Sequence, residues 1–290
     1  MNKKKNNFSI FSIINALILS CVIIITIYPF LFLISTSVST ASEIIAGKVT
    51  FYPHGVHFAA FRSLLREALF WNGYKNTVIY TISGTFASIA LTTICAYCLS
   101  HKQLPGSKIM TIFCVMTMFI TGGMVPTYLV VKTLGLTDTI WAIILPNAID
   151  AYYMIIMRTY FRSIPASLEE AAMIDGMGPT RILFKIFLPL SKPTIATISM
   201  FYAVSKWNMW FKPLLYLNKP ELFPISLFLR NIVFAEQISL VDVGSAADAA
   251  QIYMTMKPAA IILVTLPIIL VYPFAQRYFV SGVMLGSIKE

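Results

Sequence analysis

Charged residues are scarce in this sequence. Asp, Glu, Lys and Arg make up 12% of the 290 residues, whereas a typical soluble domain carries about 25%. Hydrophobic residues make up 58%, against roughly 45–50% in soluble proteins. This composition excludes an ordinary water-soluble enzyme, a disordered chain and a coiled coil. It predicts an all-α integral membrane protein with several spanning helices.

Acidic residues are the scarcer kind of charge. The chain has 12 Asp and Glu against 22 Lys and Arg, which gives a net charge of +10. In a soluble protein this excess is compatible with nucleic-acid binding, but membrane proteins hold Lys and Arg in their cytoplasmic loops. We therefore expect the lipid bilayer, and no nucleic acid, as a partner.

Motifs that carry chemistry are also missing. No G-x-x-x-x-G-K-[ST] phosphate cradle is present, so the chain is not expected to hydrolyse ATP. Cys95 and Cys98 form a C-x-x-C inside an apolar run, where small apolar packing is the expected role. His54 and His57 stand three apart without further ligands nearby. We expect no catalytic residue, no metal site and no cofactor bound by this chain.

Six apolar segments are long enough to cross a bilayer, which needs about 20 residues per helix. The first has no charge from Phe8 to Val38, which is too long for the apolar region of a signal peptide. We predict one transmembrane domain over 1–290, and basic residues are denser in the loops that place both termini in the cytoplasm. The predicted spans are 9–36, 76–99, 108–131, 139–160, 187–211 and 257–280.

The cytoplasmic segment 161–186 has the signals of a helical hairpin. Ser167 and Glu170 have the spacing of a capping box that starts a helix. Gly176 suits the position just past that helix, and Pro179 suits the first turn of the next one. Ala171 and Ala172 leave a flat surface that another protein can approach closely. We expect this hairpin to dock on a protein, because its acidic residues disfavour anionic lipid.

The same segment resembles a known family signature. Glu170-Ala171-Ala172, then Gly176, Ile186 and Leu188-Pro189, is similar to the EAA motif of permease subunits of binding-protein-dependent ABC importers. The resemblance implies the MetI-like fold of type I ABC importers, in which this loop couples an ATPase to the membrane helices. The ATPase-coupling residues implied are Glu170, Ala171, Ala172, Asp175 and Gly176.

Weaker matches along the chain resemble carbohydrate-uptake permeases of the maltose-permease type, in the branch for polysaccharides or complex oligosaccharides. They include Tyr28-Pro29-Phe30, Trp207-Asn208, Pro213-Leu214 and Gln276-Arg277. The sequence departs from that pattern at Met209-Trp210, which follows Trp207-Asn208. The resemblance implies a subunit of the bacterial cytoplasmic membrane that works with a second homologous permease, two ATP-binding subunits that hold ATP and Mg, and an extracellular solute-binding protein.

Among the few charged residues that fall inside the predicted spans, two are candidates for a function, because a charge at membrane depth is costly. They are Asp150 and Lys206, and the neighbouring aromatic and amide side chains suit sugar rings and hydroxyls. A buried structural pair, or a charge that reaches water at a span end, fits the sequence equally well. The candidate substrate-pathway residues are Asn147, Asp150, Tyr152, Tyr153, Tyr202, Lys206, Trp207 and Asn208.

Two further patterns concern helix packing. Small residues recur every fourth position in the second span, which predicts a close-packing ridge. The ridge consists of Gly84, Ser88, Thr92, Ala96 and Ser100. The third span is interrupted by Gly122-Gly123 and Pro126, which is typical either of a helix that borders a transport pathway or of a plain kink.

Other transport functions remain open at this point. An ABC permease for an amino acid, a peptide or phosphate has the same coupling loop. A secondary transporter driven by an ion gradient is a second alternative, although it leaves the EAA motif unexplained. The sequence does not name the sugar.

Overall fold

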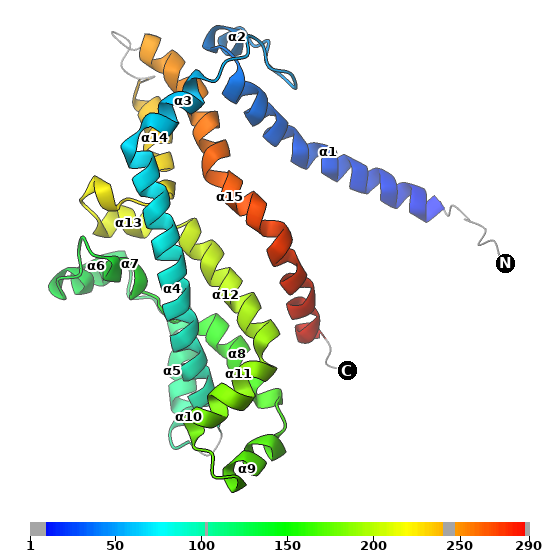
Figure 1. Cartoon of the computed structure of the whole chain (residues 1–290), viewed down its shortest axis with the longest axis vertical. Helices are drawn as coiled ribbons and strands as arrows, with labels where there is room; N and C mark the ends of the chain where they lie inside the picture. The colour runs from blue at the N-terminus through cyan, green and yellow to red at the C-terminus, as the bar shows by residue number, and fades with distance from the viewer. Residues whose placement is uncertain (1–9, 102–103, 240–246, 288–290) are drawn as a thin grey trace. The chain divides into compact units, whose positions relative to one another are not determined.

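The computed structural model describes residues 10–101, 104–239 and 247–287, and these residues form helices and connecting loops (Figure 1). They divide into two compact units. The first unit contains the chain up to Glu67 together with Leu229–Leu266. The second contains Ala68–Phe228 and resumes at Pro267. The assignment of the whole chain to one domain stays a prediction.

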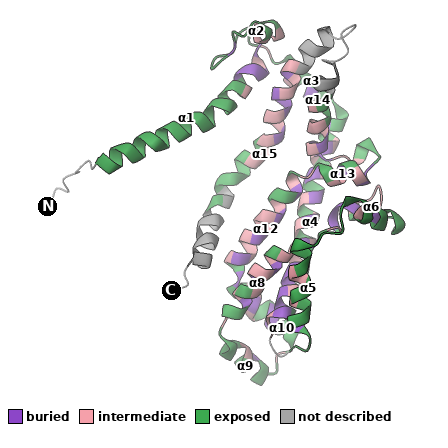
Figure 2. Ribbon diagram, turned by 180° about the vertical axis from the view of Figure 1, so that it is seen from behind, coloured by how far each residue is buried: buried purple, intermediate pink, exposed green. Residues whose placement is uncertain are grey.

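The first unit begins with a long apolar helix, α1 (Ile10–Val38). Its side chains are exposed along most of its length (Figure 2). A helix that is apolar all round and exposed is suited to lipid or to another membrane helix. The helices that follow in this unit are α2 (Ala41–Ile45), α3 (Ala59–Arg66), most of α14 (Ile225–Ser239) and the first half of α15 (Ala247–Ser287).

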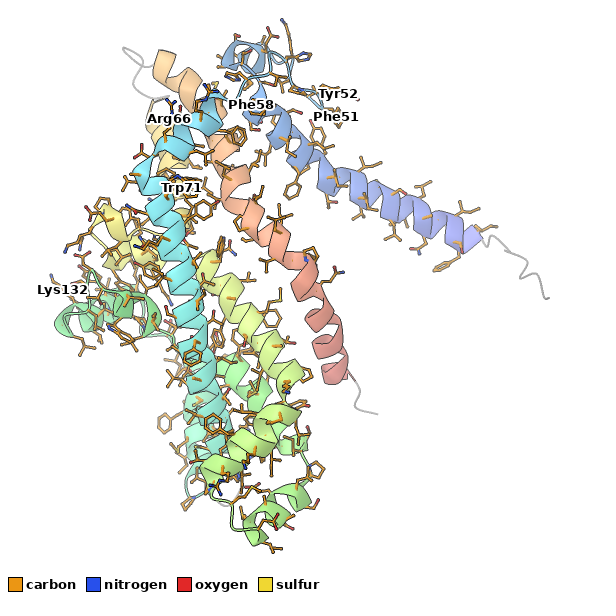
Figure 3. All side chains as sticks on the ribbon, in the orientation of Figure 1. Phe51, Tyr52, Phe58, Arg66, Trp71 and Lys132 are labelled. Atoms are coloured by element: carbon orange, nitrogen blue, oxygen red, sulfur yellow. The ribbon has the colours of Figure 1, made fainter. Side chains whose placement is uncertain are left out.

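Hydrogen bonds hold the end of α1 against the segment that follows α2. The Ser35 hydroxyl donates to the Phe51 carbonyl at 2.8 Å, and the His54 amide donates to the Ser39 hydroxyl at 3.0 Å. The ring of Phe51, which is labelled in Figure 3, also contacts the Tyr28 ring edge-on, with 5.2 Å between the ring centroids. The end of the first predicted span is therefore fixed to the segment after α2 by specific side-chain contacts.

The second unit is organised around α4 (Ala68–Ser100), which packs against α8 (Ala151–Ser163) and α12 (Lys192–Trp207). Gly84, Ser88, Thr92 and Ala96 are buried, as the predicted ridge requires. At two of these positions the neighbour is α12: the Thr92 hydroxyl bonds the Tyr202 hydroxyl at 2.8 Å, and Gly84 lies against Lys206. At these positions the ridge packs within the chain.

The predicted third span is broken. Helices α5 (Ser107–Phe119) and α6 (Met124–Thr133) meet at a bend of 116°. Gly123 has φ +84°, a backbone conformation that favours glycine. The interruption predicted from Gly122-Gly123 is confirmed.

The predicted fourth span, 139–160, is wrong as a continuous helix. Helix α7 (Ile140–Ile144) ends early, and α8 starts only at Ala151. The intervening segment contains Pro146, which has no N–H to donate, and Asn147, which adopts φ +62°. A hydrophobic run on its own did not reveal this break.

The fifth span also begins later than predicted. The hairpin's second helix continues through α10 (Pro179–Ile182), the π-helical turn η1 (Leu183–Phe187) and α11 (Leu188–Leu190). The chain then bends by 85° into α12. Prolines and π-helical turns are recognised causes of such bends, and Pro189 and Pro193 flank this one.

The end of α4 near Ala68 carries the remaining short elements, α13 (Phe211–Tyr216) and η2 (Pro220–Leu222). Asn76 donates to the Glu221 carbonyl at 2.7 Å, and the Tyr80 hydroxyl donates to the Leu222 carbonyl at 2.9 Å. Polar groups of α4 thus fix the loop that precedes α14.

By length and composition, three of the described helices can cross a membrane, and two bent pairs pass the same test when each pair counts as one span. The three are α1, α4 and Met254–Pro273 of α15. A count of six spans, and the cytoplasmic placement of both termini, stay predictions.

Candidate functional sites: the α12 cavity and the helical hairpin

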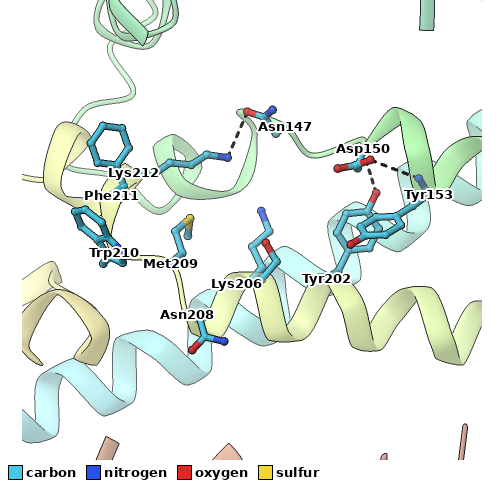
Figure 4. A pocket seen from close by; sticks show the side chains of 11 residues that line it. Asn147, Asp150, Tyr153, Tyr202, Lys206, Asn208, Met209, Trp210, Phe211 and Lys212 are labelled. Atoms are coloured by element: carbon cyan, nitrogen blue, oxygen red, sulfur yellow. Dashed lines mark hydrogen bonds between the residues drawn. The ribbon is translucent and has the colours of Figure 1, made fainter. Parts of the chain in front are cut away.

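A cavity of about 400 Å³ lies at the end of α12 farthest from the hairpin (Figure 4). We call it the α12 cavity. It is formed by the loop before α8, the first turn of α8, the last two turns of α12 and the turn into α13. Its lining residues are Asn147, Asp150, Tyr153, Tyr202, Ser205, Lys206, Asn208, Met209, Trp210, Phe211 and Lys212.

Most of the predicted pathway residues come together here, and two do not. Asn147, Asp150, Tyr153, Tyr202, Lys206 and Asn208 line the cavity. Tyr152 points elsewhere, with 56% of its surface exposed, and its ring touches that of Tyr153. Trp207 does not line the cavity, and its buried indole N–H has no hydrogen-bond partner among the described residues.

Asp150 occupies a different structural position from the one predicted. It is the N-cap of α8, because its carboxylate accepts the backbone N–H of Tyr152 at 2.9 Å and of Tyr153 at 3.4 Å. An N-cap carboxylate satisfies donors that the helix itself leaves open. The placement of Asp150 in the middle of a span is therefore wrong, since the helix has not yet begun there.

Tyr202 ties three segments together at the cavity wall. Its hydroxyl bonds Thr92 of α4 at 2.8 Å and accepts the Asp150 backbone N–H at 3.0 Å. Its ring contacts that of Tyr153 edge-on at 4.9 Å. These contacts fix the position of the α8 start relative to α12.

Lys206 is the most buried charged residue of the cavity, with 7% of its surface exposed. Its aliphatic stem lies on α4 at Gly84, where an added Cβ would sit 3.3 Å from the Lys206 Cδ and Cε atoms. Figure 4 shows the side chain pointing into the cavity. The missing side chain at Gly84 makes room for this lysine.

Lys212 enters the cavity from α13. Its ammonium group donates to the Pro146 carbonyl and to the Asn147 Oδ1, each at 3.3 Å, and burial lowers the pKa of Lys212. In the sequence this residue directly follows the predicted fifth span, 187–211, and so falls in a connecting loop. Five lining residues were not among the predicted pathway residues, because the turn at 208–210 that brings most of them to the cavity has no strong sequence signal. They are Ser205, Met209, Trp210, Phe211 and Lys212.

The hairpin over residues 161–186, which the sequence predicts to lie in the cytoplasm, forms the second site. Helix α9 (Ala166–Ile174) starts after Pro165, which shows that the Ser167–Glu170 capping box is wrong. Its predicted end is confirmed: Gly176 has φ +76°, its N–H donates to Met173, and the Met177 N–H donates to Ala172. This is the Schellman pattern of helix termination.

The coupling residues do not share one face of α9. Glu170, Ala171, Asp175 and Gly176 are exposed. Ala172 is only 3% exposed and belongs to the hydrophobic core that α4, α8 and α12 form. The expectation that Ala172 presents a surface to another protein is therefore wrong, because helical spacing turns it toward its own chain.

Two contacts that the sequence did not reveal attach the hairpin to α4. The His101 Nε2 lies 2.6 Å from the Glu169 carboxylate, while its Nδ1 lies 2.8 Å from the Tyr97 carbonyl. The Tyr97 hydroxyl also donates to the Pro179 carbonyl at 3.2 Å. The only sequence signal is that His101 and Glu169 are polar residues in segments predicted to lie on the same side of the membrane.

Residues 106–284 match the family described as "Binding-protein-dependent transport system inner membrane component". The chain belongs to this family, and it is a membrane permease component of an ABC transport system. The match contains both the α12 cavity and the hairpin.

Known relatives cover nearly the whole chain. The "Polygalacturonan/rhamnogalacturonan transport system permease protein YtcP" of Bacillus subtilis is 41% identical and covers 92% of this chain and 93% of its own. Protein LplC of the same organism is 36% identical over 97% and 95% of the two chains. AraQ of Halalkalibacterium halodurans, named for arabinooligosaccharide transport, is 26% identical over 91% and 92%.

The fold is also known from a crystal structure of a bacterial ABC transporter involved in the import of the acidic polysaccharide alginate. It matches with a TM-score of 0.84 and 32% identity, over 96% of this chain and 100% of that one. The all-helical MetI-like permease fold predicted from the sequence is confirmed.

Proposed function

We propose that the chain forms half of the translocation pathway of an ATP-driven importer for an oligosaccharide. In this proposal an extracellular solute-binding protein delivers the sugar, and a second, homologous permease supplies the other half of the pathway. Two separate ATP-binding subunits hold ATP and Mg, and this chain is a non-catalytic subunit. The names of the relatives support a sugar as the substrate.

The observation that carries the proposal is that α12 connects the two candidate sites. The α12 cavity lies at one end of this helix, and the hairpin leads directly into the other. A helix of 16 residues is about 24 Å long. A displacement of the hairpin can therefore reach the cavity through one rigid element.

The chemistry of the cavity suits a sugar. Asn147 and Asn208 offer amide groups that both donate and accept hydrogen bonds. Trp210 and Phe211 offer aromatic faces on which the apolar face of a sugar ring can stack. In our proposal these groups bind the hydroxyls and the ring of a sugar in one orientation.

The hairpin has the surface of a docking element. Leu168, Met173 and Ile174 of α9 expose 43%, 53% and 87% of their surface, although all three are apolar. Exposed apolar side chains next to acidic ones are typical of protein contacts. In our proposal these side chains contact the ATP-binding subunit.

The proposed cycle is alternating access. Binding of ATP closes the two ATP-binding subunits and pulls on α9. The motion passes through His101 to α4 and through α10 and α11 to α12, and the cavity opens outward to receive the sugar. Hydrolysis of ATP then returns the permease to its resting state.

The test is gentle detergent extraction of the tagged chain from its native membrane, followed by mass spectrometry. We expect a second permease, an ATP-binding subunit and a solute-binding protein to co-purify. The recovered binding protein is then screened on a glycan panel, and the best glycan is tested for ATP-dependent uptake in proteoliposomes. Recovery of the chain alone, with transport that depends on an ion gradient and not on ATP, would contradict the proposal.

A further inference from the structure

The α12 cavity contains a buried cation that has no partner. Lys206 exposes 7% of its surface, and its ammonium group makes no hydrogen bond or ion pair to any residue that the structure describes. The Lys206 Nζ is not among the fully enclosed polar atoms, so the ammonium group opens into the cavity, and a charge with so little access to water is stabilised by a compensating anion. The side chain points into an open cavity, so the missing partner can come from outside the chain.

The carboxylate already present does not compensate Lys206. Asp150 lines the same cavity, but its Oδ1 accepts two backbone N–H groups at the start of α8. No ion pair within 4.0 Å joins it to either lysine in the described part of the chain. Two lysines and one aspartate leave the lining with an excess of one positive charge.

We propose that Lys206 and Lys212 form a subsite for the carboxylate of an acidic sugar, so that the transported oligosaccharide contains uronate residues. This inference rests on the proposed function. The carboxylate takes the place of the missing partner of Lys206, and Lys212 lines the same cavity and adds a second positive charge. Trp210 and Asn208 lie within the same cavity to bind the ring and its hydroxyls.

The charge balance favours a carboxylate over a phosphate. A sugar phosphate carries nearly two negative charges at neutral pH. The carboxylate of Asp150 repels a dianion more strongly than a monoanion, and the lining offers only one excess positive charge. A carboxylate of the partner permease is the other possible source of the anion, and the experiment separates the two.

The experiment measures direct binding of an oligogalacturonate to the detergent-purified transporter complex without its solute-binding protein. The matched probe is the fully methyl-esterified oligomer of the same length, which keeps the shape and loses the charge. We expect the wild-type complex to bind the acid at least ~10-fold more tightly, the effect of one charge-assisted hydrogen bond. Lys206→Gln should reduce that preference to near unity, whereas Lys206→Arg should retain most of it.

The control variant is Lys132→Gln, which removes the same charge from an exposed site on α6, outside the cavity lining (Figure 3). It should keep the wild-type preference. If Lys206→Gln does not assemble with the partner permease, Lys212→Gln takes its place and should lower the preference several-fold. Tighter binding of an analogue that carries a phosphate in place of the carboxylate would overturn the assignment to a carboxylate.

Two results distinguish failure of this inference from failure of the proposed function. Equal binding of acid and ester by the wild type, with ATP-dependent uptake of the ester, overturns the subsite and leaves an oligosaccharide importer. Together with a Lys206→Gln variant that folds but no longer assembles with the partner permease, it identifies that permease as the source of the anion. Absence of ATP-dependent uptake of any oligosaccharide by the wild-type complex contradicts the proposed function itself.

Discussion

Single residues in this protein have two distinct structural roles, close helix packing and helix capping. Gly84 has the first role. It lies on α4 where the stem of Lys206 crosses, and a Cβ there would come within 3.3 Å of two Lys206 carbons. A glycine in the middle of a helix costs about 1 kcal/mol relative to alanine. The close approach of α12 is what requires it.

Replacement of Gly84 tests this packing. Gly84→Leu should destabilise the protein by roughly 1–3 kcal/mol, the usual cost of an overpacked core, whereas Gly84→Ala should have a smaller effect. The measurement is thermal unfolding of the detergent-purified complex. Ile82→Leu, at an exposed position on the same helix, is the control and should leave the transition unchanged. Wild-type stability of Gly84→Leu would show that α4 and α12 do not pack here.

Asp150 has the second role, because its carboxylate caps the start of helix α8. Asp150→Ala should cost about 1 kcal/mol, because the Tyr152 and Tyr153 N–H groups lose their acceptor. Asp150→Asn keeps an acceptor oxygen and should retain both stability and transport. Thermal unfolding and ATP-dependent uptake are measured on the same preparations. Loss of uptake in a stable Asp150→Asn protein would indicate that the charge, and not the cap, is needed.

At the scale of elements, the hairpin is attached to the bundle by side chains as well as by the chain itself. Ala172 packs into the core of the second unit, and His101 holds Glu169. The end of α4 is further capped by Arg158 and Arg162, which donate to the Leu99 and Ser100 carbonyls at 2.8 and 3.1 Å. Helix α9 and the end of α4 are therefore expected to move together.

The link between α9 and α4 is tested by His101→Ala. We expect ATP hydrolysis to continue while transport per ATP falls, since the hairpin then moves without α4. Glu169→Gln keeps an oxygen that accepts the His101 N–H and should behave nearly as the wild type. Both rates are measured in proteoliposomes with the complete transporter. Unchanged transport per ATP in His101→Ala would show that the hydrogen bond carries no coupling.

The loop before α7 is held by Asp138, whose carboxylate accepts the Asn218 backbone N–H at 2.5 Å, the Asn218 side-chain N–H at 3.1 Å and the Lys219 N–H at 3.3 Å. These hydrogen bonds, the Asn218 backbone bond first, lower the pKa of Asp138. A lowered pKa means that the stabilisation is present above the unfolded value of about 3.9 and is lost as pH falls through the folded value.

Acid should therefore release this loop. Hydrogen–deuterium exchange at the Asn218 and Lys219 amides, corrected for intrinsic rates, should accelerate as pH falls below about 4. In Asp138→Asn the acceleration should disappear, because the side chain no longer titrates. The Tyr80 contact to Leu222 contains no carboxylate, and exchange in the neighbouring loop at Phe223 serves as the internal reference. An identical pH profile in Asp138→Asn would contradict this assignment.

At the scale of the whole molecule, the hairpin and the α12 cavity lie at opposite ends of one helix. A substitution in the hairpin should therefore affect transport through the cavity. Gly176→Phe forces a side chain into a left-handed backbone conformation at the docking surface. Glu170→Lys reverses an exposed charge on the same surface. Each should abolish uptake and leave membrane insertion intact, as judged by the amount of chain in the membrane fraction. Normal uptake in either variant would remove the hairpin from the coupling mechanism.

Much of the fold was predictable because lipid imposes a simple rule. A long apolar run must form a helix there, since no water is available to the backbone. The runs that became α1 and α4 were found for this reason, and Gly122-Gly123 revealed the broken third span. The fourth span was not resolved, because Pro146 and Asn147 interrupt a run whose hydrophobicity alone predicts a continuous helix.

The site was predictable in composition and not in geometry. Asp150 and Lys206 stood out as charges within apolar segments, and both line the α12 cavity. Lys212 did not stand out, because a lysine in a loop is ordinary. It becomes a cavity residue only after the turn at 208–210 places α13 beside the loop that contains Asn147.

The sequence by itself determined the class of protein, the main membrane helices and the hairpin with its glycine end. These features depend on local composition and on spacing over a few residues, so they can be predicted without knowledge of tertiary contacts. Only the tertiary structure decided that Asp150 caps a helix, that Ala172 faces its own core and that Lys206 is buried without a partner. Each of these depends on contacts between segments far apart in the chain, such as Tyr202 with Thr92 and Asp150.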